Sequence, residues 1–246
     1  MNYAFDFSSI IPYWPQLLNG LCLTIIMTVL ATVFGLALGI LMAVARRSSL
    51  RLLSVLAGIY VEALRNTPFI VQIFFLYFGL ASAGIHLPAV VASIIAMVLN
   101  VGAYTGEIIR AGLDSVPAGQ LEAAECLGLS KVKIFFYVSL TPALENVYPA
   151  LTSQFVLMML MSSVTSQISA EELSGAAYNI QSTTFRAMEV YIAIAVMYVI
   201  IALGLKLFFV ALGEVIFKRK RALRRGSRGR YDVSQAFMGP RGERLP

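Results

Sequence analysis

Residues 16–45 read QLLNGLCLTIIMTVLATVFGLALGILMAVA, a mostly apolar run that contains no charged side chain and ends at Arg46 and Arg47. A helix of about 20 apolar residues is long enough to cross the hydrocarbon core of a bilayer. The run therefore predicts a membrane-spanning helix, and it is too long to be the core of a cleavable signal. Tyr13 and Trp14 precede it, and such rings are typical of the membrane interface.

The composition of the whole chain indicates the same class of protein. Of its 246 residues, 59% are hydrophobic and 13% are charged, and the mean hydropathy is +0.79, as in a polytopic membrane protein. We predict one transmembrane domain over residues 1–217. The net charge of +6 is concentrated in a tail, residues 218–246, which we expect to be cytoplasmic and to face lipid headgroups rather than nucleic acid.

Four further apolar stretches follow and predict an all-α protein with five transmembrane helices. They cover residues 52–84, 87–109, 147–161 and 187–217. The stretch 52–84 would reach about 50 Å as one straight helix, against a hydrocarbon core of about 30 Å. We expect one span that bends at Pro68, because proline lacks an amide donor and clashes with the preceding turn.

Basic residues set the expected orientation in the membrane. The loop 46–51, the polar loop that contains Lys131 and Lys133, and the tail should all face the cytoplasm. An even number of crossings must then separate each pair of these segments, which one bent span over 52–84 satisfies and two separate helices would not. We therefore predict an N-terminus outside and a C-terminus inside.

Small residues form a ridge along the first span. They recur at four-residue spacing, at Ala31, Gly35, Gly39 and Ala43. Such a ridge lets another helix approach closely. A helix of the same chain is the preferred partner, and a second copy of the chain is the alternative.

A polar segment, residues 113–144, interrupts the apolar pattern and contains the stretch EAAECLG at residues 122–128. Its periodicity predicts an amphipathic cytoplasmic helix pair broken near Gly128, where a residue without a side chain permits a turn. An apolar face with small residues can be bound in a cleft of a partner protein. The candidate docking residues are Glu122, Ala123, Ala124, Leu127 and Gly128.

The same segment, read as DSVPAGQLEAAECLGLS over residues 114–130, resembles the permease subunits of ATP-binding-cassette importers. It is similar to their polar amino-acid branch, which serves histidine, arginine, glutamine, glutamate and opines. Three further stretches continue the similarity: EALRNTPFIVQIFFLYFG at 62–79, AYTGEIIR at 103–110 and PALTSQF at 149–155. The resemblance covers residues 16–217.

This resemblance implies a type I importer permease fold in a bacterial inner membrane, with residues 113–144 as the coupling loop. It implies an ATPase partner, a second permease subunit that is either identical or paralogous, and a substrate-binding protein outside. No cofactor is expected in this chain, because the ATPase would bind the ATP and Mg²⁺. The substrate would be a polar amino acid.

The chain departs from the family where the family commonly has Leu-Lys-Asp/Asn-Ser/Thr-Ser. Residues 159–163 here read MLMSS, so the fixed positive charge is absent. A site without that cation favours a neutral or basic amino acid over glutamate or aspartate. A second departure places the proline after the loop at Pro142 rather than directly after Leu140.

Ionisable groups inside the membrane need partners or a water-filled path. Glu62 with Arg65, and Glu107 with Arg110, lie three residues apart and can pair along one helix face as structural charges. Neutral polar groups on the later spans are the candidates for a substrate pathway, and hydrogen bonding between helices is their alternative role. These groups are Asn100, Tyr104, Gln154, Ser162 and Ser163.

Residues 162–186 are the longest polar segment expected outside, and three interpretations remain open. The segment could meet a substrate-delivering protein, form an outer gate, or be a solvated loop.

The sequence offers no evident catalytic or metal site. Cys22, Cys126 and His86 form no ligand cluster or disulfide pattern, and the chain lacks a Gly-x-x-x-x-Gly-Lys-Ser/Thr phosphate loop. A transport subunit is therefore expected rather than an enzyme. The alternative is an ion-coupled secondary transporter of small polar solutes, which would normally show paired repeats with broken helices. No internal repeat is found.

Overall fold

The computed structural model describes residues 4–217, and all regular elements in that range are helical, which confirms the predicted all-α class. The chain divides into two compact units, and the described part of the second is residues 207–217. The long helices are α1 (Trp14–Arg46), α5 (Ala89–Asp114), α8 (Thr141–Met161) and α10 (Ala187–Ile216). The shorter ones are η1 (Phe7–Tyr13), α2 (Arg51–Arg65), α3 (Phe69–Phe74), η2 (Phe75–Gly79), α4 (Leu80–Ser82), α6 (Ala118–Cys126), α7 (Lys131–Lys133), η3 (Ile134–Leu140), η4 (Ser162–Ile168) and α9 (Leu173–Thr184). The predicted tail, residues 218–246, lies outside the described residues.

The described residues contain four uninterrupted helical stretches that are long and apolar enough to cross a membrane, and one broken stretch brings the number to five. The uninterrupted stretches are Phe7–Arg46, Ala89–Asp114, Lys131–Ile168 and Ala187–Ile216. The third of them begins well before the predicted start of that span at residue 147. Lys131, Lys133 and Glu145 lower the hydropathy there, although the backbone is already helical from Lys131.

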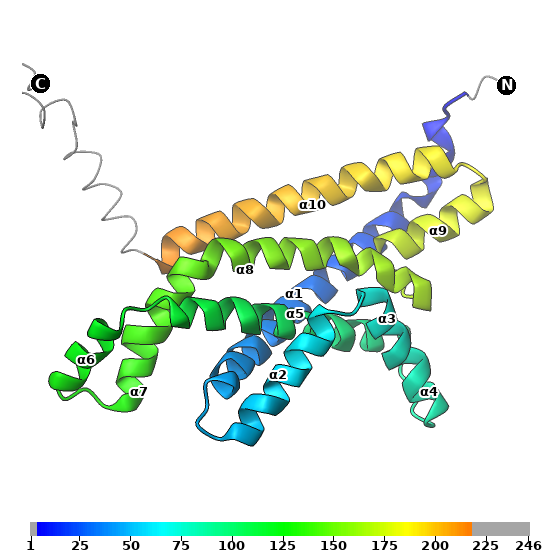
Figure 1. Ribbon diagram of the computed structural model, residues 1–246. Coiled ribbons are helices and arrows are strands. Elements are labelled where there is room, and N and C mark those ends of the chain that lie inside the picture. Colours follow the sequence, from blue (N-terminus) through cyan, green and yellow to red (C-terminus); the bar gives the residue numbers. More distant parts are fainter. Residues whose placement is uncertain (1–3, 218–246) are drawn as a thin grey trace, which may run out of the picture. The chain divides into compact units, whose positions relative to one another are not determined.

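The predicted bend at Pro68 is a complete break rather than a curve. Arg51–Arg65 and Phe69–Ser82 meet at 111°, and α2 diverges from α3 and α4 on either side of the break (Figure 1). Pro68 is extended, with φ −61° and ψ 141°. Proline also disfavours the helical conformation at the residue before it, so the helix ends at Arg65 instead of bending through the site.

The ridge of small residues on α1 packs against α5 of the same chain, which was the preferred prediction for its partner. Ala31, Gly35, Gly39 and Ala43 are all buried. A Cβ atom on Gly39 would overlap Thr105 Oγ1 and lie 2.9 Å from the backbone nitrogen of Gly106. Because the two backbones approach this closely, α1 and α5 form the centre of the first unit.

A second apolar cluster joins α1, α9 and α10 at the end of the first unit that carries the N-terminus. Leu17, Leu173, Ile180, Val190 and Ile194 are each at most 5% exposed. This cluster seats α9 against the start of α1 and α10. The polar segment between α8 and α10 is therefore largely a packed helix rather than a plain solvated loop.

Candidate functional site

The predicted coupling segment is a helical hairpin that projects from the end of α5 (Figure 1). Helix α6 ends at Cys126, Gly128 adopts a left-handed φ of +72°, and a new helix starts at Lys131. A left-handed backbone is favourable for glycine and costly for other residues, so Gly128 makes the turn possible.

The hairpin exposes apolar side chains that have no covering element within the described residues. Leu127 is 80% exposed, Val132 66% and Tyr137 76%. Of the predicted docking residues, Ala124 is buried, whereas Glu122, Ala123, Leu127 and Gly128 are exposed. An exposed apolar patch of this kind is typical of a surface that binds a partner, as predicted for these residues.

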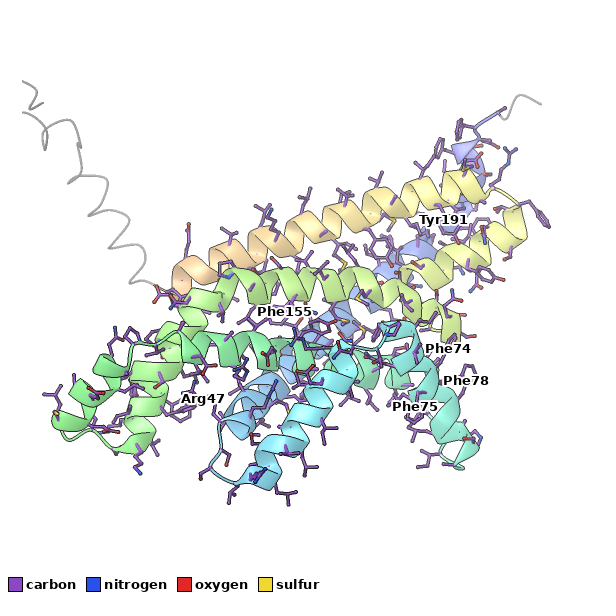
Figure 2. All side chains as sticks on the ribbon, in the orientation of Figure 1. Arg47, Phe74, Phe75, Phe78, Phe155 and Tyr191 are labelled. Atoms are coloured by element: carbon purple, nitrogen blue, oxygen red, sulfur yellow. The ribbon has the colours of Figure 1, made fainter. Side chains whose placement is uncertain are left out.

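A network of ion pairs joins the end of α5 to the end of α1. Arg110 Nη2 lies 2.5 Å from Glu107 Oε1, and Arg110 Nη1 lies 2.7 Å from Asp114 Oδ2. Arg46 Nη1 lies 2.7 Å from Glu107 Oε2, and Arg47 pairs with Asp114. Figure 2 shows Arg47 beside the end of α5. Asp114 is the last residue of α5 and leads into the hairpin, so this ion-pair network connects the hairpin with α1.

One of the two predicted charge pairs is replaced by contacts between helices. Glu107 pairs with Arg110 as predicted. Among the described residues, however, the ion pair recorded for Glu62 is with Arg46, at 4.0 Å, and Arg65 lies over the ring of Tyr104, 5.7 Å from its centroid. The three-residue spacing of Glu62 and Arg65 does not determine their partners. The packing of α1 and α5 against α2 places Arg46 near Glu62 and Tyr104 near Arg65.

At the break after α2, Gln72 satisfies backbone carbonyls that have lost their helical partners. Its Nε2 atom donates to Leu64 O at 2.7 Å and to Thr67 O at 3.0 Å. The Oε1 atom of Gln72 then accepts from Asn100 Nδ2 at 2.9 Å. This chain of bonds fixes the orientation of the Asn100 amide. Its Oδ1 atom is buried and has no hydrogen-bond partner.

Two of the predicted pathway residues, Asn100 and Tyr104, thus meet at the break. The hydroxyl of Tyr104 donates to Arg65 O at 3.4 Å. Gln72 also belongs to this group, although it was not among the pathway residues predicted from the sequence. Its position four residues after Pro68 was the available signal, since a side chain there can reach the carbonyls that the proline frees.

The other three predicted pathway residues lie on α8 and η4. Gln154 is half-buried, and no hydrogen bond recorded within residues 4–217 joins it to Asn100 or Tyr104. Ser162 donates to Met159 O at 2.7 Å, and Ser163 donates to Leu160 O at 2.8 Å. The two serines therefore bond to carbonyls at the end of α8, and these bonds do not join them to the break.

A buried carboxyl group at the start of α9, that of Glu172, was not among the residues predicted from the sequence. Glu172 Oε1 accepts from the backbone of Ser174 at 2.9 Å and Gly175 at 3.0 Å, and Oε2 accepts from Tyr198 at 2.8 Å. Glu172 lies in the segment that connects two candidate spans, after Ile168 and before Ala187. Burial raises the pKa of its carboxyl, although these hydrogen bonds oppose the shift. An N-cap position after a polar turn was the one sequence signal for this role.

Comparison with known proteins places the chain among transport proteins. Residues 35–222 match the family described as "Binding-protein-dependent transport system inner membrane component". The chain is 37% identical over 196 residues to the L-cystine transport system permease protein TcyB of Bacillus subtilis (strain 168), covering 79% of this chain and 84% of that protein. It is 33% identical over 218 residues to the octopine transport system permease protein OccM of Rhizobium radiobacter, covering 83% and 87%.

Solved structures agree with this match. The structure titled "Crystal structure of an amino acid ABC transporter with histidines" superposes with a TM-score of 0.79 at 35% identity, covering 86% of this chain and 99% of that chain. An inward-facing MetNI methionine ABC transporter superposes with a TM-score of 0.69 at 20% identity, which is a likeness of fold alone.

Proposed function

We propose that this chain, which belongs to the binding-protein-dependent transport system inner membrane component family, is the permease subunit of an importer of polar amino acids. It is a transport subunit rather than an enzyme, and a separate ATPase supplies the energy. Alternating access of the membrane helices to the two sides moves the substrate. The relatives' names, which include cystine, arginine, glutamine and octopine permeases, support an amino acid as the cargo.

The observation that carries the proposal is the exposed hairpin formed by α6 and the helix that starts at Lys131. Its apolar side chains, with Leu127 80% exposed, suit a cleft on an ATPase subunit. The ion-pair network lies where the hairpin meets the membrane helices, so a rigid movement of the hairpin reaches α1 through Asp114 and Arg47. A secondary transporter is driven by an ion gradient and does not bind an ATPase, so it does not require such a hairpin. This alternative is therefore not favoured.

The break after α2 is the proposed substrate pathway, together with Asn100, Tyr104 and Gln154. Asn100 Oδ1 is a buried acceptor without a partner, and an unpaired buried polar atom costs about 1–3 kcal/mol unless a ligand or water satisfies it. An acceptor oxygen binds the ammonium of an amino acid. The absence of a positively charged side chain near Leu160 favours neutral or basic amino acids over acidic ones as the substrate.

The proposed setting is the inner membrane of a bacterium, with the N-terminus outside and the hairpin inside. Ion pairs place the ends of α1 and α5 together, which agrees with the even number of crossings expected between them. The proposed assembly contains two ATPase subunits, a second permease subunit and an external substrate-binding protein, with ATP and Mg²⁺ held by the ATPase.

Uptake into proteoliposomes that contain the complete transporter tests the function. Labelled amino acid should accumulate when ATP and the ATPase are present, and a proton or sodium gradient alone should not drive it. Gradient-driven uptake without the ATPase would overturn the proposal.

Competition with a panel of amino acids then tests the substrate. Neutral or basic amino acids should compete best, and Gln154→Ala should weaken their apparent affinity. Best competition by aspartate and glutamate would reject the charge argument, and unaltered affinity in Gln154→Ala would remove that residue from the site.

A further inference from the structure

A polar pocket lies at the turn between η4 and α9, and none of its lining residues belongs to the hairpin or to the break after α2. It has a volume of about 550 Å³ and is lined by residues of η4, of α9 and of the turn between them, with Tyr191 from α10. Figure 2 shows Tyr191 near the start of α10, beside α9. Ligand pockets of about 300–1,000 Å³ hold small molecules, so an amino acid fits this volume.

Several side chains around the pocket keep their hydrogen-bonding groups free. Gln167, Glu171, Tyr178, Asn179 and Tyr191 line it, and within residues 4–217 none of their side chains makes a recorded hydrogen bond or ion pair. Polar groups that converge in a pocket can fix the orientation of a small polar ligand, and the two aromatic rings add apolar surface for it. A loop that served only to connect helices would not need to gather these groups.

The turn that forms the pocket wall is tightly constrained. Ser169 adopts a left-handed φ of 65°, which is unfavourable for a residue other than glycine. A Cβ atom on Gly175 would overlap Ala170 O, so only glycine fits there. Glu172, fully buried, caps α9 and bonds to Tyr198 of α10 and Thr24 of α1. The wall is therefore fixed to both neighbouring helices before any ligand binds.

The charges around the pocket favour a cation. Glu171 is the one charged side chain among the lining residues, and the other polar groups are hydroxyls and amides. The nearby Arg186 is committed elsewhere, because its Nη1 atom lies 3.3 Å from Glu189 Oε1 and donates to Ala4 O at 3.0 Å. The rings of Tyr178 and Tyr191 add faces that attract an ammonium group.

We propose that this outer pocket is a second binding site for an amino acid, which it holds by the α-ammonium group. Glu171 accepts from the ammonium, and the amides of Gln167 and Asn179 bond to the rest of the ligand. The proposal rests on the proposed function, since it places the site where cargo arrives before it reaches the break near Asn100. A free amino acid is the proposed occupant because one carboxylate and two amides offer partners for its ammonium group and its other polar atoms, and the pocket is large enough to admit it.

Equilibrium binding to the complete transporter, without ATP and without the binding protein, tests the site. The probes are labelled L-arginine and L-glutamine, with N-acetyl-L-glutamine as the analogue that lacks the ammonium. Glu171→Gln should weaken binding of both probes roughly tenfold or more, the effect of losing one charge-assisted hydrogen bond. The acetylated analogue should fail to compete. Ser182→Ala, an exposed α9 position outside the pocket, is the matched control and should leave binding unchanged.

The outcomes separate this site from the proposed pathway. Asn100→Leu should leave the Glu171-dependent binding in place. Binding that survives Glu171→Gln unchanged, or that the acetylated analogue competes for equally well, overturns the outer site. If ATP-driven uptake of every amino acid fails while Glu171-dependent binding persists, the proposed function is wrong and the outer site stands.

Discussion

Replacing Gly39 with alanine should destabilise the contact between α1 and α5 on which the membrane domain is built. The added Cβ atom would overlap Thr105 Oγ1 and lie 2.9 Å from Gly106 N. The Thr105 hydroxyl would have to leave its 2.7 Å bond to Val101 O, or the two helices would have to separate.

Three contributions determine how much Gly39→Ala changes the free energy of unfolding. Alanine favours a helix over glycine by about 1 kcal/mol. Overpacking of a close helix contact costs about 1–3 kcal/mol, and the lost Thr105 bond costs about 1 kcal/mol. The net loss is therefore about 1–3 kcal/mol for Gly39→Ala. Gly58→Ala on α2 is the matched control, because a Cβ atom there meets nothing within 4 Å, and it should gain up to about 1 kcal/mol.

The assay is the Tm of the detergent-solubilised protein, measured as the temperature at which the folded peak is lost in size-exclusion chromatography. For a chain of this length 1 kcal/mol shifts Tm by roughly 2–4 °C, so Gly39→Ala should melt at least about 2 °C below Gly58→Ala. Adding Thr105→Ala to Gly39→Ala should recover part of the loss, since neighbouring substitutions couple. Equal Tm values for the two glycine variants would refute the close-packing argument.

Three other substitutions test the charged groups and the hairpin. Gly128→Asp places a side chain at a left-handed turn and should abolish co-purification with the ATPase or uncouple ATP hydrolysis from uptake, whereas unchanged coupled transport would contradict the docking role. Arg46→Gln removes the bridge to Glu107 and should lower uptake per ATP by up to ~5-fold, as expected for one partly exposed ion pair; an unchanged ratio would exclude a coupling role. Glu172→Gln should gain stability relative to the native protein as pH rises above 4.5. The raised pKa of the Glu172 carboxyl in the folded state makes a stabilising contribution that is fully present below this ordinary value and is lost as pH rises through the raised pKa, whereas glutamine does not titrate. A Tm difference that stays constant from pH 4.5 to 8 would contradict this.

Features encoded within one segment were predictable from the sequence. The run over residues 16–45 determined a span because a bilayer requires about 20 apolar residues in a row. The small-residue ridge at Gly35 and Gly39 determined a close helix contact, and Gly128 determined a turn in a polar helical segment. Each of these inferences depends on residues within a few turns of one another, where periodicity and backbone conformation carry the information.

The tertiary structure alone decided which distant groups meet. Arg46 and Arg47 pair with Glu107 and Asp114 because α1 and α5 end at the same level, and no spacing along either helix indicates that. Pro68 predicted an interruption, but the 111° angle depends on how the two segments pack. A pair of side chains far apart in sequence interacts only if the fold brings them within a few ångströms. The sequence by itself therefore determined the helices and their breaks, and the packing of the helices determined the ion-pair network, the orientation of the Asn100 amide and the outer pocket.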